Sequence, residues 1–282
     1  MQVIRPLIMG VVNVTPDSFS DGGRFLDHDA AIEHARAIVS QGADWVDVGG
    51  ESTRPRADPV PADEELRRVV PVVEALARDG VAVSIDTRKA EVARAAVAAG
   101  ARMINDVSAS LGEVAADEGA AFVAMHMLGD PTTMQDDPTY DDVVLHVRDY
   151  LVAKAEAAAA AGAVEVWIDP GIGFGKTLDH NLDLLANLDV LVATGFPVLV
   201  GTSRKQMIGR LAARADASAT RATHRGTAGG QVPVPPPSDR LEGSVATAVW
   251  SWRTGAAMVR VHDVAATVRA RDALVASATA AA

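Results

Sequence analysis

Two kinds of segment alternate along the chain. Short apolar runs rich in Val and Ile end in a polar residue and a turn, and longer Ala-rich runs with charges at helical spacing follow them. This alternation is typical of βα units on a parallel sheet, and uninterrupted apolar strands indicate burial on both faces. The pattern predicts strands at residues 7–13, 45–49, 82–86, 102–106, 121–126, 165–169, 197–201 and 258–261.

The longer segments between these strands are predicted to be helices. They cover residues 29–41, 62–78, 89–99, 113–118, 141–161, 181–194, 205–214, 240–255 and 264–278. Glycine favours the left-handed conformation that ends a helix, and it stands where these helices should stop, at Gly42, Gly80, Gly100, Gly119, Gly162, Gly195 and Gly255. Eight βα units in about 250 residues have the size and order of a (β/α)8 barrel. We therefore expect residues 1–282 to form one α/β domain, a TIM barrel.

A doubly wound open sheet is the alternative to the barrel. That fold usually has a Gly-rich dinucleotide loop after its first strand, and residues 13–23 contain no GxGxxG pattern. One segment, 215–238, departs from the βα pattern because its Gly, Pro, Thr and Ala content has no periodicity. Such a composition predicts a flexible loop with a polyproline stretch, inserted between the two helices of the seventh unit.

Composition and charge narrow the possible partners. Hydrophobic residues make up 49% of the 282 residues, which is ample for a core, but aromatics are only 4%, so Ala, Val, Leu and Ile must build it. The net charge of −11 argues against general nucleic-acid binding, which depends on basic patches. An anionic ligand would need a local cationic site.

The compartment is indicated by cysteine content and by hydropathy. The chain has no cysteine, which excludes disulfides, thiolate metal sites and cysteine nucleophiles and fits a reducing compartment. The apolar run near the N-terminus is too short for a membrane span and does not have the pattern of a secretory signal. We expect a cytoplasmic protein with no membrane partner.

The predicted strand ends carry the candidate chemistry, because active sites of (β/α)8 barrels lie at the C-terminal ends of the strands. The polar positions there are Asn13, Gly49–Glu51, Asp86, Asn105, Asp106, His126, Asp169, Thr202–Lys205, Arg260 and His262. A structural role is possible for each one singly, since Asp after a strand often caps the next helix. For Asp106 and Ser108, a capping role and a role in ligand binding are both open. Thr87 can cap the helix that follows Asp86, which leaves Asp86 free to bind a ligand.

The residue types at these positions suggest a ligand with two parts. Cations near the mouth, beside oxygen donors, suit a phosphorylated substrate with Mg²⁺; they are Arg54, Arg88, Lys205, Arg260 and His262. Asp86, Asn105 and Asp169 suit the amino and carbonyl edges of a flat heterocycle. The guanidinium of Arg260 can stack on such a ring.

Other common chemistries lack their motifs. Ser203 is not in a G-x-S-x-G elbow, and His126 has no HExxH partner, so we expect His126 to be packed or hydrogen-bonded. The run from Gly171 to Lys176 lacks Walker spacing and is interpreted as a strand-end loop that closes over a flat ligand. The long first and second loops are typical of lids that exclude water.

Eight stretches of the chain resemble, in order and over nearly its whole length, the dihydropteroate synthase family. They are 13–23 (NVTPDSFSDGG), 47–55 (DVGGESTRP), 84–87 (SIDT), 104–106 (IND), 125–127 (MHM), 168–176 (IDPGIGFGK), 201–205 (GTSRK) and 259–263 (VRVHD). The resemblance implies a (β/α)8 barrel, usually a homodimer. It also implies a transferase of folate biosynthesis that joins 6-hydroxymethyl-7,8-dihydropterin diphosphate to 4-aminobenzoate, releases diphosphate and is inhibited by sulfonamides.

The resemblance also assigns roles to residues. Asp86, Asn105, Asp169 and Lys205 would hold the pterin edge, Arg260 would stack on its face, and Met125 and Phe174 would line the pocket. Asn13 would coordinate Mg²⁺ on the diphosphate, whose oxygens would be bound by Arg54, Arg260 and His262. The 4-aminobenzoate pocket would comprise Phe19, Thr53, Arg54, Pro55, Ser203 and Lys205. The catalytic residues would be Asp21, Lys205 and Arg260, and Asp21 would help to stabilise the developing cation. Segment 215–238 is longer than the corresponding link in the family.

Three alternatives remain open on the sequence. A related pterin-binding methyltransferase barrel would bind a folate without diphosphate chemistry, and should not need Asn13 or residues 53–55. A Schiff-base aldolase would use the Lys205 amine as its nucleophile. A non-catalytic paralogue would bind pterin as a regulator or structural partner.

Overall fold

The computed structural model describes residues 5–15, 28–52, 58–223 and 233–280 of the chain. Its eight strands form one parallel sheet in the order β6-β5-β4-β3-β2-β1-β8-β7. They are β1 (Leu7–Asn13), β2 (Trp45–Gly49), β3 (Val83–Asp86), β4 (Met103–Asp106), β5 (Ala121–Met125), β6 (Val166–Asp169), β7 (Leu199–Val200) and β8 (Met258–Val261). A parallel bridge between Ile168 and Val198 joins the two outer strands, so the sheet curls into a nearly closed barrel. The predicted (β/α)8 fold is confirmed.

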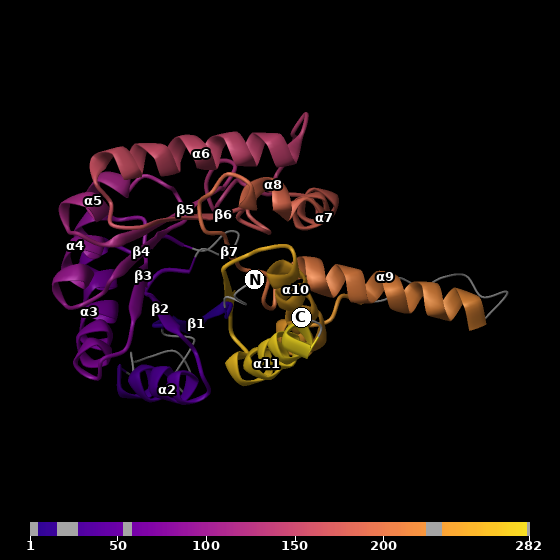
Figure 1. Ribbon diagram of the computed structural model, residues 1–282, viewed down its shortest axis with the longest axis horizontal. Coiled ribbons are helices and arrows are strands. Elements are labelled where there is room, and N and C mark those ends of the chain that lie inside the picture. The colour runs from indigo at the N-terminus through magenta and orange to yellow at the C-terminus, as the bar shows by residue number, and fades with distance from the viewer. Residues whose placement is uncertain (1–4, 16–27, 53–57, 224–232, 281–282) are drawn as a thin grey trace.

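Helices surround this barrel on its outside (Figure 1). They are α2 (His28–Ser40), α3 (Ala62–Arg78), α4 (Ala90–Ala98), α5 (Gly112–Asp117), α6 (Val143–Ala161), α7 (Leu178–Ala186), α8 (Leu188–Val192), α9 (Gln206–Thr223), α10 (Leu241–Arg253) and α11 (Val264–Ala280), with a 3₁₀ turn at Pro237–Asp239. No helix within the described residues is long and apolar enough to cross a membrane.

One predicted helix, 181–194, is wrong in its bounds. The structure has two helices there, and α7 begins three residues earlier because Thr177 caps it: the Thr177 hydroxyl accepts from the backbone N–H of His180. The chain leaves helical geometry at Asn187 (φ −115°, ψ 34°), and the short helix α8 follows.

The core has two parts, which the alternation of strand side chains separates. Outward-facing strand residues pack against the helices in the larger cluster. Inward-facing residues fill the barrel and are largely buried: Met9, Met103, Ala121, Val123, Trp167, Leu199 and Met258. Because this apolar plug fills the barrel interior, a ligand that enters the barrel meets the polar side chains above the plug, at the C-terminal strand ends.

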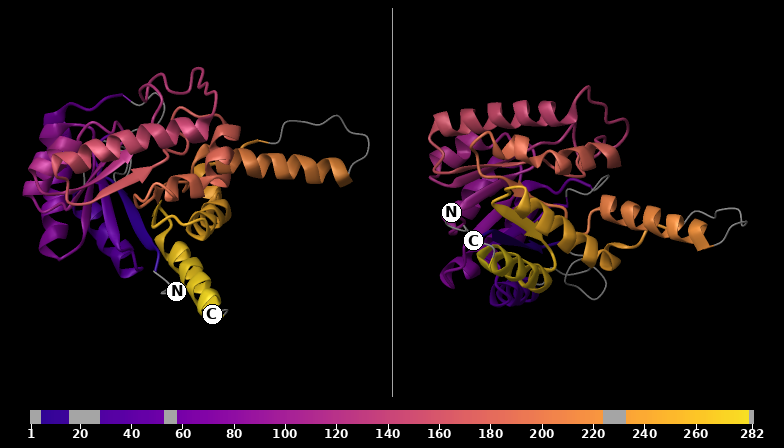
Figure 2. Two further views of the ribbon diagram at one scale, coloured as in Figure 1. Left: turned by 45° about the horizontal axis from the view of Figure 1, so that its top comes forward. Right: turned by 45° about the vertical axis from the view of Figure 1, so that its right-hand side comes forward.

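The segment 215–238 differs from its prediction. Helix α9 continues to Thr223, so the loop prediction is wrong for residues 215–223, and Figure 2 shows this helix projecting from the barrel. Residues 210–223 contain no Gly or Pro and are rich in Ala, the strongest helix former, which accounts for the extension. Residues 224–232 lie outside the described part of the chain. Beyond them, Arg240 donates to the backbone oxygens of Pro235 (2.9 Å) and Arg204 (2.8 Å) and so fixes the returning segment.

Candidate active site

Arg260 connects the polar side chains at one side of the barrel mouth. Its Nε donates to Oδ2 of Asp47 (2.6 Å) and its Nη2 donates to Oδ2 of Asp86 (2.7 Å). The same Oδ2 of Asp47 accepts from Nδ2 of Asn105 (3.0 Å). Four strands, β2, β3, β4 and β8, thus contribute to one hydrogen-bonded group at the floor of the mouth, which we call the Arg260 network.

Burial and charge shift the pKa values of this network. Burial alone would lower the pKa of Arg260, but the carboxylates of Asp47 and Asp86 raise it, so the guanidinium stays charged. Burial raises the pKa of Asp86 to about 7; the attraction of Arg260 opposes this rise and the charge of Asp47 adds to it. Near neutral pH, Asp86 can therefore present either a carboxylate or a carboxylic acid to a ligand.

Asp169 and Lys205 form the opposite side of the mouth. One carboxylate oxygen of Asp169 accepts from the backbone N–H of Gly171 (2.7 Å). The Lys205 ammonium donates to the backbone oxygen of Ile172 and lies 4.6 Å from the centre of the Phe174 ring. Burial lowers the pKa of Lys205 to about 8, although Asp169 opposes this effect. Burial likewise raises the pKa of Asp169 against the attraction of Lys205.

The loop from Gly171 to Gly175 lies against the end of β5. Gly171 has a φ of +64°, and a Cβ there would stand 1.9 Å from the backbone oxygen of His126, so only glycine fits. The hydroxyl of Tyr140 donates to Gly175 O (2.7 Å), and the amide of Asn181 accepts from Gly173 N–H (2.6 Å). These contacts hold the loop in place and so fix the position of the Phe174 ring at the edge of the site.

Lys176 holds the same loop from below. Its Nζ is buried and donates to the backbone oxygens of Gly171 (3.0 Å), Phe174 (2.9 Å) and His126 (3.3 Å), and it lies 2.9 Å from Nδ1 of His126. Burial lowers the pKa of His126 to about 3, with the nearby Lys176 charge adding to the effect, so the imidazole is neutral. His126 is packed and hydrogen-bonded, as predicted.

Three further candidates lie at the rim of the mouth. The hydroxyl of Ser203 accepts from the backbone N–H of His262 (3.1 Å) and lies 3.1 Å from its Nδ1. Asn13 ends β1 beside Gly49 of β2 and is half-buried. No cluster of three or more His, Asp or Glu among the described residues could hold a metal ion. A single neutral oxygen donor such as Asn13 does fit Mg²⁺ that is bound mainly by substrate phosphates and water.

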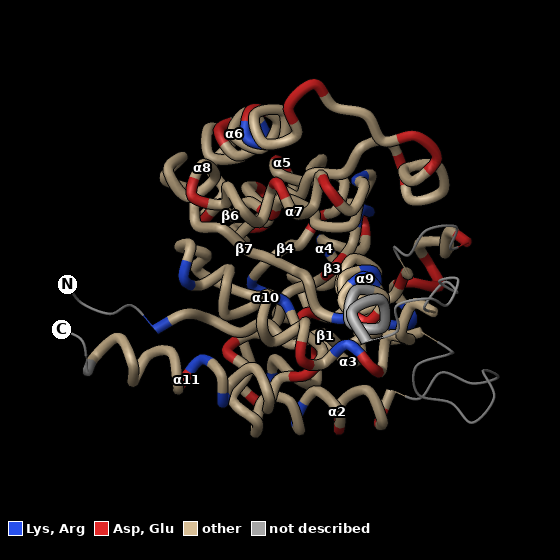
Figure 3. Tube along the Cα trace, turned by 90° about the vertical axis from the view of Figure 1, so that its right-hand side faces the viewer, with Lys and Arg blue, Asp and Glu red and all other residues tan. Residues whose placement is uncertain are grey.

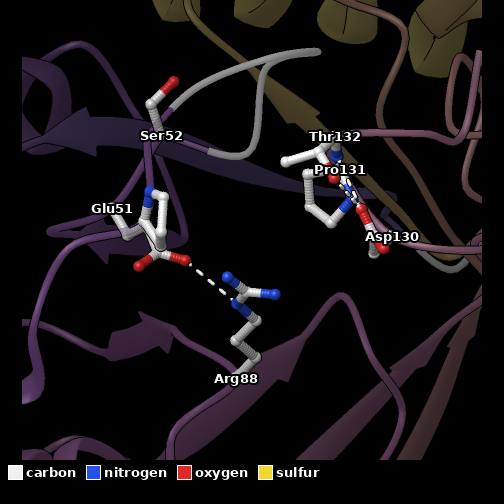
Figure 4. Close-up of a pocket in the computed structure, with 7 residues that line it drawn as sticks. Glu51, Ser52, Arg88, Asp130, Pro131 and Thr132 are labelled. Atoms are coloured by element: carbon white, nitrogen blue, oxygen red, sulfur yellow. Dashed lines mark hydrogen bonds and ion pairs between the residues drawn. The ribbon is translucent and has the colours of Figure 1, made fainter.

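A pocket of about 230 Å³ opens between the start of the second loop and the loop after β5 (Figure 4). Its lining comprises Glu51, Ser52, Pro59, Arg88, Asp130, Pro131 and Thr132. Glu51 accepts from Arg88 Nε (3.0 Å), Lys89 Nζ (2.6 Å) and the backbone N–H of Val60 (2.9 Å). Burial alone would raise the pKa of Glu51, but these hydrogen bonds lower it. Arg88, predicted as a ligand cation, is therefore paired with Glu51 and anchors the base of the second loop.

The structure brings together most of the predicted site residues that it describes. Asp86, Asn105, Asp169, Phe174, Lys205 and Arg260 face one mouth, Met125 lies beside Asp169 on the paired strand, and Asn13, Ser203 and His262 lie at the rim. Five lie outside the described residues: Phe19, Asp21, Thr53, Arg54 and Pro55. Asp106 has a structural role instead, since it accepts from the backbone N–H groups of Ser108, Ser110 and Leu111 in the turn before α5; it does not cap that helix itself.

Two residues of the site were missed from the sequence, Asp47 and Lys176. A signal existed for Asp47: it stands between Val46 and Val48 in an apolar strand, and a buried carboxylate requires a cationic or hydrogen-bonding partner. Lys176 offered no such signal, because a lysine after a glycine-rich turn is ordinarily exposed.

Acidic residues are spread over the outer helices and loops (Figure 3), while at the mouth the cations Lys205 and Arg260 lie beside the carboxylates of Asp47, Asp86 and Asp169. Fold and site together define a pterin-binding enzyme on a (β/α)8 barrel, and residues 9–262 match the family model described as pterin binding enzyme. The chain is 46% identical to dihydropteroate synthase of Mycobacterium leprae, over 93% of this chain and 90% of that one. The chain belongs to the dihydropteroate synthase family.

Solved structures agree with this assignment. The Yersinia pestis dihydropteroate synthase with a sulfonamide drug complex superposes with a TM-score of 0.85 at 42% identity, covering 99% of this chain and 96% of that one. The Xanthomonas albilineans enzyme with 4-aminobenzoic acid gives a TM-score of 0.83 at 46% identity, covering 99% and 94%.

Proposed function

We propose that this chain condenses 6-hydroxymethyl-7,8-dihydropterin diphosphate with 4-aminobenzoate to give 7,8-dihydropteroate and diphosphate, a transferase step of folate biosynthesis. The observation that carries the proposal is the convergence of Asp86, Asn105, Asp169, Lys205 and Arg260 on one mouth, in a chain of this family. The structure of the Xanthomonas albilineans relative with 4-aminobenzoic acid supports the second substrate.

The polar groups complement a pterin edge. A pterin alternates N–H donors with ring nitrogen and carbonyl acceptors. The Asp169 carboxylate accepts from two adjacent N–H groups, and the Lys205 ammonium donates to the carbonyl or a ring nitrogen. The Phe174 ring, whose centre lies 4.6 Å from Lys205 Nζ, would line the pterin pocket beside that ammonium. Because Asp169 is buried, its hydrogen bonds to the ligand would be made away from bulk water and would discriminate strongly.

The diphosphate would lie at the rim, near Asn13, His262 and the outer side of Arg260. Asn13 would hold Mg²⁺ through its carboxamide oxygen. When bound, Mg²⁺ would neutralise negative charge that develops on the leaving diphosphate. Two loop residues keep the roles that the family resemblance gives them: Arg54 would bind diphosphate oxygens, and Asp21 would help to stabilise the developing cation. The 4-aminobenzoate pocket of this proposal is completed by Phe19, Thr53, Pro55 and Ser203.

The reaction needs no strong base. The C–O bond to diphosphate breaks, the positive charge delocalises into the pterin ring, and the arylamine nitrogen forms the new C–N bond and then releases a proton. An arylamine is neutral near pH 7 and attacks without prior deprotonation. The chain's task is to position both substrates, to exclude water, and to place the Asp86 and Asp169 carboxylates near the cation.

The test is diphosphate release by the purified chain with both substrates and Mg²⁺. We expect release that needs both substrates, that a sulfonamide inhibits in competition with 4-aminobenzoate, and that the Asp169→Ala variant loses together with pterin binding measured by calorimetry. Pterin binding without diphosphate release would instead favour a methyltransferase-type or non-catalytic barrel. Trapping of Lys205 by borohydride with a carbonyl substrate would favour an aldolase.

We also propose a homodimer in the cytoplasm. The family resemblance supports the dimer, and the absence of cysteine supports a reducing compartment. Sedimentation of the purified chain at micromolar concentration should give the mass of two chains; a single-chain mass would contradict the dimer. Fractionation of the source cells should recover the chain with the cytosolic fraction.

A further inference from the structure

Asp47 lies one layer below the residues that face the ligand. It stands in the middle of β2, paired in register with Ser84 of β3, and its side chain is fully buried. Its Oδ2 accepts from both Arg260 and Asn105, while its Oδ1 has no hydrogen-bond partner among the described residues. A buried carboxylate of this kind is costly, and its two donors are both residues of the proposed pterin site.

The contact with Asn105 decides which end of that amide meets a ligand. An asparagine side chain can turn over, exchanging its NH₂ donor with its carbonyl acceptor at little steric cost. An ionised carboxylate can only accept. Asp47 therefore draws Nδ2 of Asn105 toward itself, at 3.0 Å, and leaves Oδ1 of Asn105 as the atom available to a ligand.

The contact with Arg260 fixes the plane of the guanidinium. Asp47 holds Nε at 2.6 Å and Asp86 holds Nη2 at 2.7 Å, and two charge-assisted hydrogen bonds at such lengths leave little rotation about the end of the side chain. Nη1 is the nitrogen that neither carboxylate engages, and it remains for the ligand. Without Asp47, the bond to Asp86 would be the one remaining side-chain hydrogen bond from the guanidinium within the described residues.

We propose that Asp47 is a positioning residue that sets the hydrogen-bonding polarity of the pterin site, by presenting Asn105 as an acceptor and Arg260 in a fixed orientation. The proposal rests on the proposed function and adds a determinant of ring selectivity to it. The ligand class selected is an aminopteridine that offers an N–H donor to Asn105. A pteridine-dione, which has a carbonyl in place of the amino group, is disfavoured.

The experiment compares the affinities of each protein for pterin and for lumazine, the corresponding pteridine-2,4-dione, by calorimetry. In Asp47→Leu and Asp47→Ser, nothing fixes the Asn105 amide, so it can turn to donate to lumazine. We expect the pterin-to-lumazine affinity ratio to fall about tenfold, the size of one mismatched buried hydrogen bond. We expect KM for the pterin diphosphate to rise while KM for 4-aminobenzoate changes by less than about twofold.

Two further variants separate positioning from general damage. In Asp47→Asn a carbonyl oxygen can occupy the Oδ2 position and accept from both partners, so the affinity ratio should stay near that of the wild type. Ser84→Ala removes a neighbouring buried hydroxyl that has no hydrogen-bond partner among the described residues, and it should leave the ratio unchanged.

The outcomes are distinct. A structural role alone would weaken both ligands equally, and an unchanged ratio in folded Asp47→Leu or Asp47→Ser would overturn the proposal while leaving the proposed function intact. If the leucine variant does not fold, the smaller serine variant decides. Loss of selectivity in Asp47→Asn equal to that in Asp47→Ser would also overturn it. A wild-type protein that binds no pterin would overturn the proposed function, and this proposal with it.

Discussion

Replacing Lys176 with methionine should release the loop from Gly171 to Gly175 from the end of β5. The ammonium donates to three backbone oxygens, and both the side chain and two of these partners, His126 and Gly171, are buried. An unsatisfied buried carbonyl costs about 1–3 kcal/mol. Three carbonyls would lose their donor, but a glycine-rich loop can rearrange and recover part of the cost. We therefore expect the free energy of unfolding to fall by about 3 kcal/mol, which lowers Tm by about 6–12 °C for a chain of this size.

The same substitution should affect one substrate selectively. Phe174 and the backbone oxygen of Ile172, which accepts from Lys205, both belong to this loop, so KM for the pterin diphosphate should rise more than KM for 4-aminobenzoate. Urea and thermal unfolding followed by circular dichroism measure the stability, and steady-state kinetics measure KM. The control is Lys154→Met on α6, whose ammonium lies 5.6 Å from the Tyr150 ring and which should cost less than about 1 kcal/mol.

The pH dependence of stability offers an independent check. Burial lowers the pKa of Lys176 well below 10.5 in the folded protein, so the folded chain releases this proton before the unfolded chain does. Over the interval from that lowered pKa up to 10.5 the unfolded state binds more protons, and the Lys176 contribution to stability rises with pH. The methionine variant should lack this rise. Equal stability of the two proteins, together with parallel pH curves, would refute the role given to Lys176.

Three other perturbations have definite expected outcomes. Asp86→Asn should remove a pH effect: since the pKa of Asp86 is raised to about 7, the folded state binds more protons between about pH 4 and 7, and wild-type stability should fall with rising pH across that window. Chemical denaturation at several pH values checks this, and a variant curve parallel to that of the wild type would contradict it. Asp142→Ala should cost about 1 kcal/mol, because Asp142 caps α6 by accepting from Val144 N–H (2.9 Å) and Leu145 N–H (3.0 Å); an unchanged Tm would count against that cap. Asn13→Ala should weaken the response of diphosphate release to Mg²⁺, and chelation should abolish release in the wild type; the same Mg²⁺ dependence in both proteins would remove Asn13 from the metal site.

The fold could be predicted from the sequence because each of its eight βα units leaves the same local pattern of apolar and polar residues. Each strand is an apolar run and each helix is an amphipathic or Ala-rich segment, so eight units could be counted without knowing how they pack. The boundaries of β1, β2, β8 and α3 were predicted correctly to the residue. Bounds were wrong where hydrogen bonds between specific atoms decide them, as at Thr177, or where helix propensity continues past the expected stop, as in residues 215–223.

The sequence by itself located the strand ends, to the residue for six strands and within one residue for β5 and β7, and the geometry of a parallel barrel requires strand ends to meet at one mouth. It could not determine the partner of each residue there. Asp106 and Asp47 are both strand aspartates, yet Asp106 turns outward to cap a turn while Asp47 turns inward to hold Arg260, 213 positions away in the chain. Only the tertiary structure decided this, because hydrogen bonds and pKa shifts depend on distance and burial, and the residues that control them here come from strands far apart in sequence.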